Sequence, residues 1–146
     1  MRILVDTNIL LRAAQRSHPA GRVAINAIKA LHRQQNVLCL APQNLIEFWN
    51  VCTRPVDVNG LGLSVAGTDR YVKKLKILFT IIHDSPQTFE KWHALVLQYN
   101  VIGSKVHDAR LAAVMRTYGI TSVLTFNVKD FNRYGGITAI DPNTVS

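Results

Sequence analysis

The chain has 146 residues, 48% of them hydrophobic, which is enough for one domain with a full core. No apolar run reaches the roughly 20 residues that a membrane-spanning helix needs, and Asp6 interrupts the apolar N-terminus before a signal peptide is complete. The 17 Lys and Arg against 9 Asp and Glu give a net charge of +8, which favours a polyanionic partner such as nucleic acid or an acidic protein. We therefore expect a soluble, cytoplasmic protein with a single domain, residues 1–146. Cys39 and Cys52 lack zinc-site spacing and are expected to be reduced core thiols.

Short apolar runs alternate with amphipathic segments along the chain. The apolar runs predict buried strands of a parallel sheet at residues 2–6, 37–41, 79–83, 121–126 and 137–140. Helical spacing of apolar residues predicts helices at residues 21–35, 42–54, 68–78, 86–99 and 105–118. The remaining polar or glycine-rich segments predict loops at residues 12–20, 56–67 and 127–136. This alternation is typical of an α/β domain with a central parallel sheet.

Acidic residues are scarce, and most of those in apolar surroundings fall where a predicted strand ends. Asp6 ends the first strand, and Glu47 lies about one turn into the helix after the second. Asp108 lies in the first turn of a late helix, and Asn127 and Asp130 follow the fourth strand. Open α/β sheets bind ligands beyond the carboxyl ends of their strands, so these side chains are expected in one crevice. Each of these acids also has a simpler explanation when it is taken singly. Asp108 could merely interact favourably with the helix dipole, and Asp130 could be an ordinary turn residue.

Several carboxylates in one crevice repel each other unless one is protonated or a cation neutralises them. No Lys or Arg lies near these acids in the flanking predicted strands, since Arg2 stands at the opposite end of its strand from Asp6. A hard divalent ion with oxygen ligands fits, and Mg²⁺ or Mn²⁺ is the usual choice. Such a site can activate water and stabilise the charge that develops on a phosphoryl group. In a basic protein it indicates hydrolysis of a nucleic-acid phosphodiester.

Four motifs carry a resemblance that spans nearly the whole chain: ILVDTNILL at 3–11, NLIEFWNV at 44–51, HDARLAAV at 107–114 and VLTFNVKDF at 123–131. In this order they resemble the PIN-domain family, and more closely the VapC-type ribonuclease toxins of type II toxin–antitoxin modules. The resemblance implies a three-layer α/β/α sandwich around a mainly parallel sheet of four to five strands. It also implies an endoribonuclease dependent on Mg²⁺ or Mn²⁺, a cognate small antitoxin as partner, and a homodimer.

The resemblance also assigns the candidate catalytic positions. The family's acidic residues correspond to Asp6, Glu47 and Asp108, while its fourth acidic position falls on Asn127. An amide offers an oxygen ligand without a charge, and Asp130 in the same loop would supply the missing carboxylate. Polar positions of the family that would orient carboxylates or water are matched by Thr7, Asn8 and Thr125.

These assignments lead to a hypothesis for the mechanism. Asp6 and Asp108 hold the metal, partly through water, while Glu47 and Asp130 orient or deprotonate the attacking water. In-line attack at phosphorus leaves a 5′-phosphate and a 3′-hydroxyl. Basic residues near the expected mouth either bind RNA phosphates or are plain surface charge: Arg12, Arg16, Arg54, Arg110 and Lys129.

Two other functions compete with this one. A haloacid-dehalogenase-type phosphotransferase also places an Asp after its first strand, but it needs a second Asp where this chain has Asn8. A non-catalytic RNA- or protein-binding domain with a degenerate acidic site is the second alternative, and Asn127 is the residue that keeps it open. The apolar pairs Leu10–Leu11 and Phe48–Trp49 are candidate antitoxin contacts, with core packing as the alternative.

Overall fold

Five parallel strands form one sheet in the computed structural model, which describes residues 1–146. The strands are β1 (Arg2–Val5), β2 (Val37–Leu40), β3 (Thr80–Ile81), β4 (Ser122–Leu124) and β5 (Thr138–Ile140). Their order in the sheet is β3-β2-β1-β4-β5, so the chain builds outward from β1 first on one side and then on the other. This reversal lies between β1 and β4, where doubly wound sheets have their ligand crevice.

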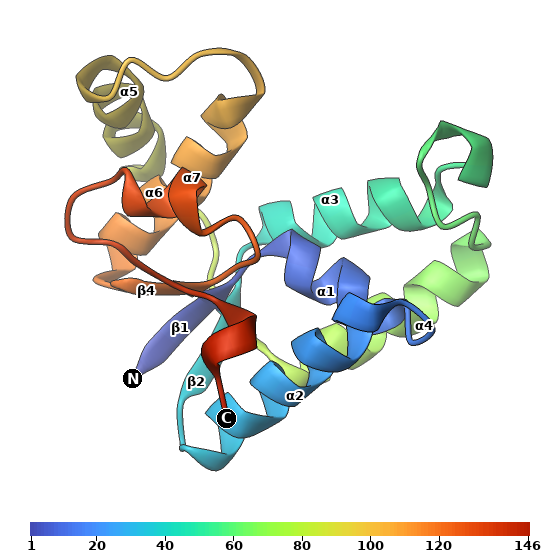
Figure 1. The fold of residues 1–146 in the computed structure, drawn as a ribbon. Helices are drawn as coiled ribbons and strands as arrows, with labels where there is room; N and C mark the ends of the chain where they lie inside the picture. Colours follow the sequence, from blue (N-terminus) through green and yellow to red (C-terminus); the bar gives the residue numbers. More distant parts are fainter.

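Seven α-helices cover the two faces of the sheet and complete the three layers (Figure 1). One layer holds α1 (Thr7–Ala14), α2 (Pro19–Arg33), α3 (Pro42–Thr53) and α4 (Val65–Leu78). The other holds α5 (Thr88–Gln98), α6 (Val106–Tyr118) and α7 (Val128–Asn132). The predicted α/β/α sandwich with a parallel sheet is therefore confirmed, with five strands.

Each face of the sheet buries its own core because successive side chains of a strand point to opposite faces. In β1, Ile3 and Val5 pack with the α1–α4 layer, whereas Leu4 packs with α5, α6 and α7. Leu10 and Phe48, two of the candidate antitoxin contacts, are 2% and 1% exposed and belong to the first core. Their partners Leu11 and Trp49 are only half-buried.

Helix α6 is buried along most of its length, which places its first turn firmly against the sheet. Three alanines on it, Ala109, Ala112 and Ala113, are fully buried. Small side chains let a helix approach its neighbours closely, so α6 fits between the sheet and α5. The position of Asp108, in the first turn of α6, is thereby fixed by packing.

The structure corrects several predicted element boundaries. Residues 7–14 form helix α1, although residues 12–14 were predicted as loop and residues 7–11 were assigned to no element. Asp6 caps this helix by accepting a hydrogen bond from the Thr7 amide at 2.8 Å. The predicted loop at 127–136 contains the short helix α7. Helices expected from residues 21, 68 and 86 begin at Pro19, Val65 and Thr88, and the strand expected at 79–83 pairs over only two residues.

The two cysteines are free and buried in opposite cores, as expected for core thiols. Burial raises the pKa of the Cys52 thiol to about 11 and also raises the pKa of Cys39. Both thiols therefore remain protonated and weakly reactive near neutral pH. Among the helices, none combines the length and the apolar character that crossing a membrane requires.

Candidate active site

Four carboxylates lie at the carboxyl edge of the sheet, each placed there by the element that follows a strand. Asp6 follows β1 and caps α1, and Glu47 lies in the second turn of α3 after β2. Asp108 lies in the first turn of α6, and Asp130 lies in the short helix α7 that follows β4. Parallel strands end at one edge, so residues far apart in sequence meet there.

Asp6 is the most buried of these groups, with 6% of its surface exposed. Its Oδ1 accepts a hydrogen bond from the Thr7 amide at 2.8 Å, and its Oδ2 accepts one from the Thr125 hydroxyl at 2.7 Å. The Thr125 hydroxyl in turn accepts the amide of Asn127 at 2.9 Å and a longer bond from the side chain of Asn8 at 3.4 Å. The ends of β1 and β4 therefore fix the orientation of the Asp6 carboxylate.

A second chain of hydrogen bonds orients Glu47. The Asn44 side-chain oxygen accepts the Ala41 amide at 2.8 Å, which leaves its NH₂ group to donate to the Thr7 hydroxyl at 3.1 Å. Thr7 then donates this hydroxyl to Glu47 Oε1 at 2.9 Å. Because Thr7 donates its amide to Asp6 and its hydroxyl to Glu47, one residue positions two carboxylates.

The carboxylates are close enough to disturb each other's ionisation. Burial raises the pKa of Asp6 to about 6, and repulsion from Asp108 and Glu47 adds to this rise while the bonds from Thr125 and Thr7 oppose it. Burial also raises the pKa of Asp108, with repulsion from Asp130 and Glu47 acting in the same direction. These carboxylates therefore concentrate negative charge at the edge of the sheet, which a bound cation would relieve.

Asp130 and Asn127 are arranged differently from the other candidates. Asp130 Oδ2 pairs with Lys105 Nζ at 2.8 Å, so a lysine from the turn before α6 already partly neutralises this carboxylate. Lys105 lies outside the predicted strands and was not expected from the sequence to neutralise a carboxylate. Asn127 is exposed, and its amide, rather than its side chain, bonds to Thr125.

The donor set fits a hard divalent ion held mainly through water. No three acidic, His or Cys side chains converge closely enough to form a ready-made ligand set. Mg²⁺ commonly takes only one or two carboxylates and keeps several waters. A carboxylate offers about four acceptor sites, and two of those on Asp6 are used by Thr7 and Thr125. Asp6 therefore retains free lone pairs, and Asp108 is close enough to raise the pKa of Asp6 by repulsion.

The predicted RNA-binding residues are dispersed. Arg110 and Lys129 lie on α6 and α7 beside the candidate carboxylates Asp108 and Asp130. Arg12 bonds to the Gln15 side chain in the last turn of α1. Arg16 and Arg54 lie beyond the far ends of α1 and α3, because each of these helices begins near the site and leads away from it.

Three polar residues beside the site were not singled out from the sequence: Asn44, Gln43 and Asp84. Gln43 donates to the carbonyl of His107 at 2.9 Å and accepts from Arg110 at 2.8 Å, which ties α3 to α6. Arg110 also forms an ion pair with Asp84, which follows β3. The position of Asn44 and Gln43 one turn before Glu47, and of Asp84 after a strand, was the available signal.

The fold and this edge of the sheet define an α/β domain with a cluster of acidic residues whose oxygens suit a divalent ion. The family model described as "PIN domain" matches residues 3–137, so the chain belongs to the PIN domain family. This membership argues against the haloacid-dehalogenase alternative.

Named proteins and solved structures are similar to this chain over nearly its whole length. The chain is 26% identical over 145 residues to Ribonuclease VapC24 of Mycobacterium tuberculosis (strain ATCC 25618 / H37Rv), covering 96% of each protein. It also matches the solved structure of VapBC-1 from nontypeable Haemophilus influenzae, with a TM-score of 0.72 at 16% identity, over 99% of this chain and 100% of that one. VapBC2 from Rickettsia felis bound to a DNA fragment from their promoter matches with a TM-score of 0.70 at 17% identity, over 96% and 98%.

Proposed function

We propose that this chain is a metal-dependent endoribonuclease and the toxin of a VapBC-type toxin–antitoxin pair. The observation that carries the proposal is the buried Asp6 carboxylate, oriented by Thr7 and Thr125 and repelled by Glu47 and Asp108 at the switch point of a parallel sheet. The ribonuclease relative supports RNA as the substrate, since it aligns over 96% of this chain. Buried carboxylates with perturbed pKa values cluster at functional sites, which favours this proposal over a non-catalytic domain.

PIN-domain VapC nucleases are generally metal-dependent, and we propose Mg²⁺ or Mn²⁺ for this chain. Asp6 and Asp108 would hold the ion, with water filling the other positions. When bound, the ion supplies Lewis acidity toward the phosphoryl oxygens and lowers the pKa of a coordinated water.

The remaining groups of the site have roles that follow from their contacts. Glu47 accepts the proton of the attacking water, and the bond from Thr7 holds the carboxylate in the orientation that this requires. The hydrogen bond from Thr125 fixes the orientation of the Asp6 carboxylate. Lys129 contributes positive charge beside the site for a phosphate next to the cleaved bond.

The proposed partners follow from the relatives. The matched structures from Haemophilus influenzae and Rickettsia felis are VapBC assemblies, and a complex from Klebsiella pneumoniae described as toxin–antitoxin matches with a TM-score of 0.63 at 23% identity. We propose a cognate small antitoxin for this chain, a homodimeric state, and residues 1–146 as a single PIN domain. Co-expression with the reading frame of a neighbouring small protein, followed by co-purification, tests the antitoxin.

Cleavage of RNA by the purified chain tests the activity. The protein is incubated with structured and unstructured RNA in Mg²⁺, in Mn²⁺ and in EDTA, and the products are resolved on gels and by 5′-end sequencing. We expect cleavage with either metal, none in EDTA, and 5′-phosphate ends. Asp108→Asn should lower the rate by more than the roughly 10- to 100-fold that outer-shell changes cost at metal sites.

Asp57→Asn is the matched control, because Asp57 is an exposed acid in the short 3₁₀ turn Val56–Val58 and contacts none of the site residues. It should retain the full rate. Undiminished cleavage by Asp108→Asn or by Asp6→Ala would show that the assigned site is wrong, and absence of cleavage of any RNA would favour the non-catalytic alternative.

A further inference from the structure

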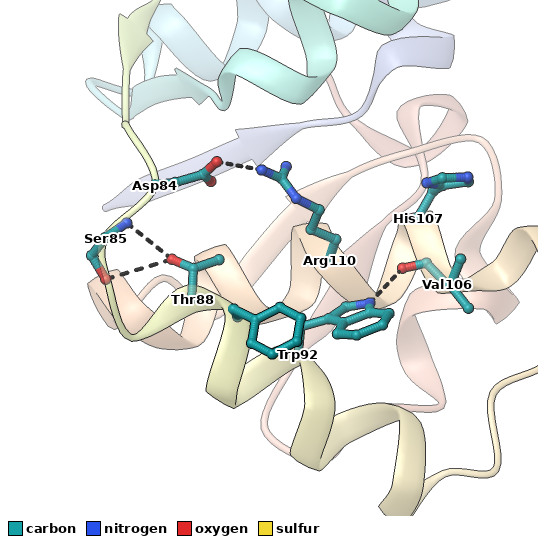
Figure 2. Close-up of a pocket in the computed structure, with 8 residues that line it drawn as sticks. Asp84, Ser85, Thr88, Trp92, Val106, His107 and Arg110 are labelled. Carbon is teal, nitrogen blue, oxygen red and sulfur yellow. Dashed lines mark hydrogen bonds and ion pairs between the residues drawn. The ribbon is translucent and has the colours of Figure 1, made fainter.

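A pocket of about 400 Å³ opens between α5, the segment before it and the first turn of α6 (Figure 2). Its lining includes Asp84, Thr88, Phe89, Trp92, His107 and Arg110. The volume falls in the range of small-molecule sites in proteins. None of the roles assigned above to the acidic residues explains this pocket.

The aromatic wall of the pocket has the form of a stacking surface. Phe89 is 62% exposed although its ring lies only 5.6 Å from that of Trp92, centroid to centroid. Trp92 donates its indole N–H to the Val106 carbonyl at 2.9 Å, so its ring is fixed in place. A large apolar side chain left this exposed beside a rigid aromatic ring contributes little to the core and leaves apolar surface open to a ligand.

The opposite wall is polar and pre-oriented. Figure 2 shows Asp84 and Arg110 paired with each other, on the other side of the pocket from the Trp92 ring. Arg110 donates one further bond to Gln43 Oε1 at 2.8 Å, which still leaves N–H groups of its five unused. The second oxygen of Asp84 remains an acceptor. The pair thus offers both a donor and an acceptor to the edge of a planar heterocycle.

Residues of α3 and α6 connect the pocket to the acidic residues at the edge of the sheet. His107, on its rim, directly precedes Asp108, and its carbonyl accepts the side chain of Gln43 at 2.9 Å. Gln43 and Glu47 are four residues apart on α3 and therefore share one face of that helix. One end of this face contacts the pocket and the other contacts the carboxylates.

We propose that this pocket binds one unpaired nucleobase of the RNA, next to the phosphodiester that is cleaved. The inference rests on the proposed function, since it takes RNA as the substrate. Sequence-tolerant recognition of single-stranded RNA stacks splayed bases on aromatic side chains and guanidinium groups, the two kinds of surface that line this pocket. The net charge of +8 favours the polyanionic strand that would deliver the base.

Binding is measured apart from cleavage, so the two proposals fail separately. A fluorescein-labelled single-stranded RNA is titrated in EDTA with the chain and with Phe89→Leu, Phe89→Ala and Phe89→Tyr, and gels check that the RNA is intact. Base–aromatic stacking predicts that Phe89→Ala weakens binding roughly 5- to 100-fold, Phe89→Leu less, and Phe89→Tyr very little. The matched control is Leu97→Ala, a 71% exposed residue of the same helix that does not line the pocket.

A second readout reports on the pocket itself. Trp49→Phe leaves Trp92 as the only tryptophan, and we expect RNA to quench its fluorescence in this variant but much less when Phe89→Ala is added. Equal RNA affinity in all Phe89 variants would overturn the proposal even if the chain cleaves RNA. A change in oligomeric state of Phe89→Ala, seen by light scattering, with unchanged RNA affinity would instead identify the pocket as a protein interface and would also overturn it. RNA binding that depends on Phe89 without any cleavage would support the pocket and contradict only the nuclease.

Discussion

The two sides of the α6 N-terminus carry opposite kinds of chemistry. On the side of Asp108, carboxylates crowd together, and hydrogen bonds from Thr7 and Thr125 hold a buried acid in place against repulsion. On the side of His107, an exposed phenyl ring and a paired arginine line an open pocket. The first arrangement is costly without a cation, whereas the second binds through surface area and needs none. Changes on the acidic side should therefore affect metal binding and ionisation, and changes in the pocket should affect substrate affinity.

The largest effect expected from a group outside the proposed ligand set is that of Thr125→Val. Valine keeps the shape of threonine but removes the hydroxyl that donates to Asp6 and accepts from the Asn127 amide. Loss of such an outer-shell group typically costs 10- to 100-fold in metal affinity, so the Mg²⁺ concentration for half-maximal cleavage should rise by about this factor. The matched control is Thr117→Val, because the Thr117 hydroxyl donates to the Ala113 carbonyl within α6 and bonds to none of the carboxylates. This change should leave the Mg²⁺ requirement unchanged. An unaltered Mg²⁺ requirement in Thr125→Val would mean that Asp6 does not bind the ion.

The next effect is on stability, where substitution of Asp6 should stabilise the folded chain at high pH although it abolishes cleavage. The pKa of Asp6 is about 6 in the folded chain, whereas its ordinary value is 3.8. Between these two pH values the folded chain therefore holds a proton that the unfolded chain has released. In EDTA, unfolding free energy should therefore fall as the pH rises from about 4 to above 6, by roughly 2–3 kcal/mol from this group. Asp6→Asn removes this dependence and should be the more stable form at pH 8 while being inactive.

Denaturant titrations of both proteins at pH 4 and pH 8 measure this difference. The change in the gap between them isolates Asp6, because a hydrogen bond lost in Asp6→Asn would shift stability equally at both pH values. A gap that does not change with pH would contradict the assignment of a raised pKa to this carboxyl.

The pocket should show a smaller effect, confined to one kinetic parameter. Phe89→Leu keeps an apolar side chain but removes the stacking ring, so we expect KM for RNA to rise about 5- to 10-fold with kcat nearly unchanged. Steady-state cleavage of one oligonucleotide measures both constants. A loss in kcat of the same size would place Phe89 in the chemical step and would remove the distinction between the two sides of α6.

The smallest effect is expected for Asp130. Lys105 pairs with this carboxylate at 2.8 Å, so Asp130 is engaged before any ion binds. Asp130→Asn should lower cleavage only a few-fold at saturating Mg²⁺, far less than Asp108→Asn, because a carboxylate already paired with Lys105 adds little charge to the site. A loss as large as that of Asp108→Asn, measured side by side, would make Asp130 a full member of the acidic site.

Much of the fold was predictable because its local signals are strong. Continuous apolar runs marked all five strands, and their alternation with helical periodicity predicted the parallel sandwich. Helices α1 and α7 were missed for a physical reason. The apolar residues after Asp6 prolong the pattern of β1, and a helix of 5 residues such as α7 is too short to show a period.

Local patterns in the sequence were enough to place Asp6, Glu47 and Asp108 near strand ends. Because all parallel strands end on the same side, these residues were expected at one edge of the sheet. How their side chains are held depends instead on contacts between elements. The hydrogen bonds from Asn44 to Thr7 and from Thr7 to Glu47 join residues from different elements. The ion pair between Lys105 and Asp130 does the same. The pocket of Phe89, Trp92 and Arg110 likewise exists only where α5 packs against α6. Such contacts depend on packing between elements, which no local pattern in the sequence encodes.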